Sequence, residues 1–139
     1  MAIFHLSNAS VVFNSVDLSN KVRSVTIDMT AEDLDATAMG ATSRAHVPGL
    51  RDDTVTVNYF NDHAAGSVDA THAAMLGVSA GAPLVVKPTS AAVSATNPSY
   101  TMTAIVLNYQ PLSGEVGNLS QTEVVYKAAP GSAIVRATA

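Results

Sequence analysis

A strict alternation of polar and apolar residues runs through residues 54–59, Thr-Val-Thr-Val-Asn-Tyr. The same alternation occurs in residues 24–30, where Val25, Ile27 and Met29 are separated by polar side chains. A period of two places every second side chain on one face of an extended chain. Both stretches are therefore predicted to be antiparallel strands with one buried face and one face in water.

Five further stretches are predicted to be strands because they are rich in β-branched and aromatic residues. They span residues 11–13, 84–87, 100–110, 119–127 and 133–138. Both faces of residues 100–110 are largely apolar, so this strand is expected to be central and covered on both sides. The connection 111–118 contains Gly114 and Gly117 and is expected to join its neighbours into a long hairpin.

One helix is predicted at residues 67–77. Ser67 suits the N-cap, Asp69 places negative charge in the first turn, and Gly77 suits the end. An apolar stripe is expected on one side of this helix, made by Val68, His72, Met75 and Leu76. Two long loops, 37–51 and 89–99, complete a mainly β chain with a single helix.

The composition favours a protein that assembles. The chain has 139 residues, which suits one domain spanning 1–139, and it has no cysteine. Charged residues make up only 13%, so a surface of small neutral residues is expected to be covered by partners. The net charge is −4 and basic residues are scattered, which argues against tight nucleic-acid binding. Neither a membrane span nor a secretory signal is recognised, and folding in a cytoplasm is expected.

No catalytic, cofactor-binding or metal-binding motif is found. The four histidines (His5, His46, His63 and His72) match no compact metal-ligand spacing, and surface or helix-packing roles are expected for them. Neighbouring Asp52 and Asp53 would point to opposite faces of a strand, which excludes a carboxylate pair. Acidic residues are expected to be solvated or to bridge subunits. A non-enzymatic function without cofactors is therefore predicted.

Several short motifs, in order along the chain, resemble the short tail tube proteins of siphophages, especially those of actinobacterial hosts. The resemblance covers nearly the whole chain. It is carried by Val16-Asp17-Leu18-Ser19 before the strand 22–30, and by residues 34–40, 48–52, 59–62 and 136–139.

This resemblance implies a β-sandwich or barrel-like tail tube fold with one flanking α-helix, a long loop and terminal arms. It also implies self-assembly into hexameric rings that stack into a hollow tail tube through which DNA is delivered. The implied partners are further copies, a tape-measure protein, and tail terminator and initiator proteins. The implied location is the virion tail, assembled in the host cytoplasm.

The resemblance also suggests roles for individual segments. Strands 22–30, 54–61, 100–110 and 119–127 would pair across subunits and line the lumen, where acids would repel DNA phosphates. Six copies of a chain with net charge −4 would give a ring of −24. The loop 37–51 and the terminal arms would reach adjacent rings. Candidate inter-ring residues are Arg44, His46 and Arg51, and candidate lumen acids are Asp28, Asp62 and Glu123.

Three alternatives remain open at this level. A capsid decoration or head–tail joining protein would have similar β character, and would form trimers or bind capsids instead of stacking rings. The inner tube of a contractile injection or secretion system would share the fold. A small ligand-binding β-domain would need a convergent polar pocket, of which the sequence gives no sign.

Overall fold

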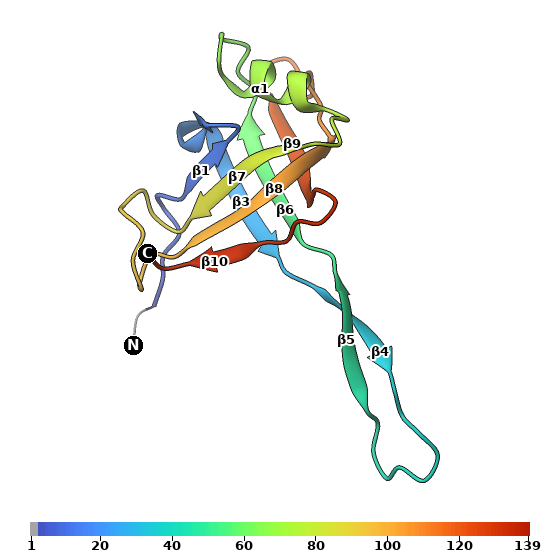
Figure 1. Cartoon of the computed structure of the whole chain (residues 1–139). Helices are drawn as coiled ribbons and strands as arrows, with labels where there is room; N and C mark the ends of the chain where they lie inside the picture. The colour runs from blue at the N-terminus through green and yellow to red at the C-terminus, as the bar shows by residue number, and fades with distance from the viewer. Residues whose placement is uncertain (1–2) are drawn as a thin grey trace.

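The structure, a computed structural model, describes residues 3–139 and is mainly β, as predicted (Figure 1). Residues 1 and 2, part of the predicted N-terminal arm, lie outside the described residues. The described residues contain one α-helix, α1 (Val68–Met75), and a short 3-10 helix, η1 (Ser19–Lys21). None of their helices has the length and apolarity that crossing a membrane requires. The strands are β1 (Ser10–Phe13), β2 (Val16–Asp17), β3 (Val22–Asp28), β4 (Ala31–Asp35), β5 (His46–Arg51), β6 (Thr54–Phe60), β7 (Ala82–Lys87), β8 (Ser99–Asn108), β9 (Gln121–Ala128) and β10 (Val135–Ala137).

Within residues 3–139, eight strands form one antiparallel sheet in the order β2-β1-β7-β8-β9-β6-β3, with β10 beside the first part of β8. The sheet folds over itself, so that β3 and β6 cross behind β7 and β8 (Figure 1). Val25 and Ile27 of β3 consequently pack against a core that also contains Val11 and Phe13 of β1. This arrangement is the sandwich or barrel-like architecture that was expected.

The core is built by the alternation seen in the sequence. Val55, Val57 and Tyr59 of β6 are buried, while the residues between them are partly exposed. Strand β9 pairs with β6 in register and buries its own alternate residues, Thr122, Val124 and Tyr126, as predicted. Burying an apolar side chain of this size contributes roughly 1.5–3 kcal/mol, so this pattern fixes which face is internal.

Strand β8 is central, as predicted, and pairs with β7, β9 and β10. Its inner face is buried through Met102, Ala104 and Val106. The expectation that both faces are covered is wrong for the chain by itself, because Leu107 is 57% exposed and Thr103 is also exposed. Only one layer of this chain lies against β8, and its outer apolar side chains remain accessible.

Helix α1 packs on one end of the sheet with Val68, Thr71 and His72 buried. Ser67 occupies the N-cap position, but its hydroxyl donates to Asp62 at 2.8 Å instead of capping the helix. The helix ends at Met75, so the predicted stripe is too long by one residue: Leu76 lies beyond the helix and is exposed.

The prediction of a loop at residues 37–51 is wrong for its second half. Residues 46–51 form β5, which pairs with β4 as a separate two-stranded sheet. The sequence of β4, Ala-Glu-Asp-Leu-Asp, does not predict a strand, because most of its residues have low strand propensity. Together β4, β5 and the connection 36–45 form a hairpin, here called the arm, which projects far from the rest of the chain (Figure 1).

Candidate assembly surfaces

A polar surface covers the outward side of β3, β6 and β9, and is here called the outer face. Its side chains alternate with the buried ones, and residues paired across neighbouring strands share the same side. Hydroxyl and amide groups predominate on it. The outer face comprises Ser24, Thr26, Asp28, Thr54, Thr56, Asn58, Glu123, Val125 and Lys127.

Two of the three candidate lumen acids lie on the outer face. Asp28 stands at the end of β3 and accepts a hydrogen bond from the Thr30 hydroxyl at 3.0 Å. Glu123 lies opposite Asn58 on the neighbouring strand and is exposed. Lys127, at the Asp28 end of the face, donates to Asp52 at 3.1 Å. The outer face therefore carries sparse charge of both signs among neutral polar groups.

The third candidate acid, Asp62, lies apart from the outer face, beyond the end of β6. Its carboxylate forms an ion pair with Lys21 at 3.1 Å and accepts hydrogen bonds from Ala64 N and the Ser67 hydroxyl. The Ala64 amide, the Ser67 hydroxyl and the Lys21 ammonium lower the pKa of Asp62 to about 2. These contacts connect η1 to the start of α1, so Asp62 has a local structural role.

The four strands predicted to pair across subunits pair with one another inside one chain. Their order is β8-β9-β6-β3, so β8, β9 and β6 already have neighbours on both sides. Strand β3 ends the sheet in residues 3–139. An unpaired strand edge presents backbone donors and acceptors to another chain. The edge of β3 is therefore the part of this group that remains open for pairing between subunits.

The arm has one polar and one apolar face. On the polar face, Asp33 contacts His46 at 2.8 Å and Asp35 pairs with Arg44 at 2.7 Å. On the other face, Leu34 lies opposite Val47, and both are exposed. A glycine at position 49 leaves room for Glu32 and Leu34 on this face, because an added Cβ would lie 3.0 Å from Glu32 Oε2 and 3.2 Å from the Leu34 side chain. Two of the candidate inter-ring residues, Arg44 and His46, thus help to order the arm itself.

The third candidate inter-ring residue, Arg51, lies at the root of the arm and pairs with Asp53 at 2.8 Å. Asp53 is only 1% exposed and also accepts a hydrogen bond from Ile134 N at 2.8 Å. The expectation that Asp53 is solvated or bridges subunits is therefore wrong. The sequence shows no sign of this role, because the contact joins residues 81 positions apart.

A buried polar chain links α1 to the sheet. His72 Nδ1 donates to Val68 O at 2.8 Å, which leaves Nε2 to accept from the Tyr126 hydroxyl. Tyr59 completes the chain by donating to the Tyr126 oxygen at 2.8 Å. Phe13 stacks on the imidazole with a ring-centroid distance of 5.4 Å. Burial lowers the pKa of His72, so the neutral ring is favoured. A helix-packing role was expected for such a histidine.

No group of three or more potential metal ligands occurs in residues 3–139. An open hollow lies between residues 6–9 and β3, lined by Ser19, Asn20 and Arg23 among others, with no acidic or histidine side chain in its lining. It does not provide the convergent polar pocket that a ligand-binding domain would need.

Similar solved structures come from a gene transfer agent particle and from an extracellular contractile injection system. A chain from the virion of a native gene transfer agent particle superposes with a TM-score of 0.72 at 11% identity, covering 92% of this chain and 95% of that one. A chain from the tail of the empty gene transfer agent particle, refined with C6 symmetry, gives 0.63 at 12% identity and covers 83% and 82%. A chain from the sheath–tube complex of an extracellular contractile injection system gives 0.71 at 8% identity, covering 99% and 93%.

These likenesses confirm the predicted fold class, because they span nearly the whole of both chains. No protein-family model and no curated protein sequence matches the chain.

Proposed function

We propose that this protein is a structural virion subunit that assembles with copies of itself into stacked hexameric rings and so forms a tail tube. The observation that carries the proposal is the shared fold, which extends over most of both chains in a tail refined with C6 symmetry. The projecting arm, the open edge of β3 and the low charge content supply surfaces suited to self-association.

The outer face is proposed to line the lumen of the tube, through which DNA passes. Neutral hydroxyl and amide groups offer few contacts to phosphate, and Asp28 and Glu123 add repulsion. Lys127 is held by Asp52 and adds little attraction. We do not assign this role to Asp62, because its carboxylate is already paired with Lys21 and Ser67.

The arm is proposed to contact an adjacent ring. Arg44 and His46 keep its polar face ordered, and Arg51 anchors its root to the body of the chain through Asp53. At the ends of the tube, terminator and initiator proteins would replace the missing ring, and a tape-measure protein would occupy the lumen during assembly. This tube would be that of a siphophage tail, because the sequence resembles siphophage tail tube proteins.

A second candidate is the inner tube of a contractile injection system. The chain of the sheath–tube complex superposes with a TM-score of 0.71, and the chain of the gene transfer agent virion with 0.72. The structural likeness therefore supports both kinds of tube about equally. The two tubes differ in whether a sheath binds the outside, which a sheath protein added to purified tubes would reveal.

Electron microscopy of the purified protein across a concentration series tests the proposal. Hollow tubes of uniform width with sixfold end views are expected, with the fraction of protein in tubes rising steeply with concentration. Monomers or trimers at every concentration, even with a tail initiator added, would contradict it and direct attention to capsid binding.

A further inference from the structure

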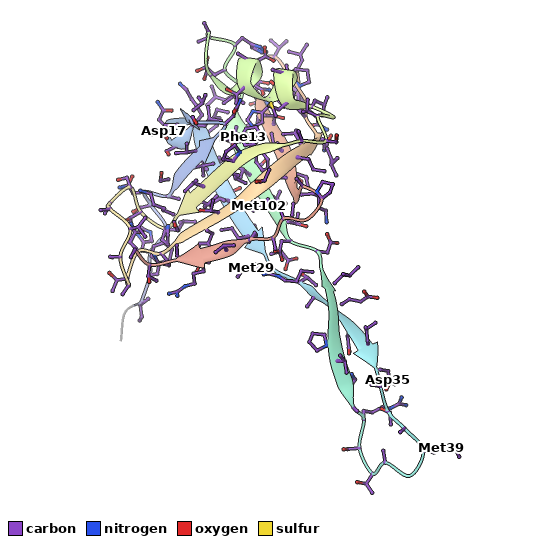
Figure 2. All side chains as sticks on the ribbon, in the orientation of Figure 1. Phe13, Asp17, Met29, Asp35, Met39 and Met102 are labelled. Carbon is purple, nitrogen blue, oxygen red and sulfur yellow. The ribbon has the colours of Figure 1, made fainter. Side chains whose placement is uncertain are left out.

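Two of the exposed apolar surfaces within residues 3–139 lie on β-hairpins. The first is on the arm, where Leu34, Met39, Val47 and Leu50 are exposed. Figure 2 shows Met39 at the tip of the arm, away from all other segments. The second is the connection between β8 and β9, residues 109–120, here called the apical loop, which exposes Leu112, Val116 and Leu119. Clusters of large exposed apolar side chains mark sites of protein association.

These two surfaces stand at opposite ends of the molecule. Strand β6 begins at Thr54, directly after the root of the arm, and ends at Phe60, which pairs with Gln121 at the end of the apical loop. Tyr109 at the other end of the loop donates to Asp69 of α1 at 2.8 Å. In Figure 1, α1 lies at the top of the molecule and the arm extends from the bottom.

The apical loop is ordered by its own contacts. Asn118 N donates to Glu115 O at 3.1 Å, and the Ser120 hydroxyl donates to Ser113 O. An open hollow in this loop is lined by Leu112 and Val116 among others. The loop therefore presents its apolar side chains on an ordered backbone, which lowers the entropy cost of binding.

The charges on the two surfaces are complementary. The connection 36–45 at the tip of the arm contains a single charged residue, Arg44, and the apical loop contains a single charged residue, Glu115. Arg44 pairs with Asp35 but its side chain remains 74% exposed. Its guanidinium has further donors that can reach a second carboxylate.

We infer that the tip of the arm of one copy docks on the apical loop of a second copy, head to tail. Because the two surfaces differ and lie at opposite ends, a bound pair of copies leaves one arm and one apical loop free. Such a heterologous contact repeats along an axis instead of closing into a dimer. The inference rests on the proposed tube and names the surface that receives the arm.

The absence of cysteine allows a direct test by crosslinking. Met39→Cys and Val116→Cys both change fully exposed side chains, so folding is expected to be unaffected. With a short bismaleimide, the double variant M39C/V116C is expected to give a ladder of covalent multimers, whereas either single variant stops at dimers. The matched control is M39C/A91C, because Ala91 is exposed in a loop far from the apical loop; at least tenfold less ladder is expected.

The outcomes separate this inference from the proposed tube. If microscopy shows tubes while the ladder forms with A91C and not with V116C, the docking surface is wrong and the tube stands. If no stacked particles form at any concentration, both fail. A ladder specific to V116C, in samples that also contain tubes, supports both.

A charge reversal tests the same contact without crosslinking. Glu115→Arg places two cations together and is expected to reduce the pelleted tube fraction at least fivefold. Glu115→Gln removes the anion without adding a cation and is expected to retain most of the tube fraction that Glu115→Arg loses. An equal loss in both variants would contradict the contact between positions 44 and 115.

Discussion

His72 lies where α1 meets the sheet and is fully buried among Phe13, Tyr59, Tyr109 and Tyr126. Both of its ring nitrogens have partners in the neutral form, because one donates to Val68 O and the other accepts from Tyr126. A proton on Nε2 would turn that acceptor into a donor facing a hydroxyl that already donates to it. The stability of the folded chain therefore depends on the protonation of this one side chain.

Stability is expected to fall as the pH drops below about 6.5, the usual pKa of histidine. Burial lowers the pKa of folded His72, while the hydrogen bond to Val68 O and the charge of Asp69 oppose this shift less strongly. The unfolded chain therefore takes up a proton that the folded chain does not, which costs at most about 1.4 kcal/mol per pH unit. Urea unfolding between pH 7.5 and 5 would measure it. His72→Gln should flatten this slope; an equal slope in that variant would contradict the assignment.

Gly81 is expected to tolerate no side chain. Its φ is +70°, and an added Cβ would lie 2.6 Å from Ala104 O. Gly66 is a matched control with a φ of +72° and nothing within 4 Å of an added Cβ. Gly66→Ala should cost about 1 kcal/mol from backbone strain. Gly81→Ala should cost roughly 2 kcal/mol more because the strand must shift. Urea denaturation of both variants gives the difference, and equal losses would show that the clash is relieved.

The arm is the element that contributes least to the body of the chain. All five residues of β4 are exposed, and an isolated two-stranded hairpin is marginally stable in water. Its order comes from the ion pairs Asp33–His46 and Asp35–Arg44 and from its root at Arg51 and Asp53. An element with so little packing in its own chain is suited to binding another copy.

Removal of the arm is expected to separate folding from assembly. Replacing residues 30–52 by Asn-Gly would join β3 and β6 through a two-residue hairpin turn, because Asp28 already pairs with Thr54. Asp53→Asn is included because the buried carboxylate loses Arg51, and the amide oxygen can still accept from Ile134 N. This variant should melt within a few degrees of the full chain in circular dichroism and yet form no tubes in electron microscopy. Tubes of normal length without the arm would contradict its proposed inter-ring role.

Prediction from sequence succeeded best for elements with strong alternation. Strand β6 is identified because its apolar residues recur at every second position, and the β8–β9 hairpin because its strands are rich in β-branched and aromatic residues. Strand β4 was missed because it has no buried face to impose such a pattern. The ends of α1 were misjudged at Leu76, where the chain turns toward β8 through the backbone bridge between Leu76 and Val106.

At the scale of the whole molecule, the low charge content and the exposed apolar groups predict how assembly depends on conditions. Charged residues make up 13% of the chain, and exposed apolar side chains occur at the arm, the apical loop and the outer side of β8. Assembly through such surfaces is driven mainly by the hydrophobic effect, which weakens on cooling and strengthens in sulfate.

Tube formation is therefore expected to be greater at 37 °C than at 4 °C and to increase with ammonium sulfate. Light scattering at fixed protein concentration would follow it, with electron microscopy confirming that the scattering comes from tubes. Sodium chloride at moderate concentration should have little effect, since few ion pairs are involved. Dissolution of tubes by moderate sodium chloride would show that charge pairs dominate the interfaces instead.

The sequence by itself determined the mainly β class, the position of the α-helix and the residues of the inner face. Burial of one face imposes a regular spacing of apolar residues along each strand and helix, and this spacing is visible in the sequence. Tertiary structure decided the burial of Asp53, the separation of Asp62 from Asp28 and Glu123, and the arm as a hairpin. It also decided that the arm and the apical loop lie at opposite ends. These features depend on contacts between residues far apart in the chain, which no local pattern records.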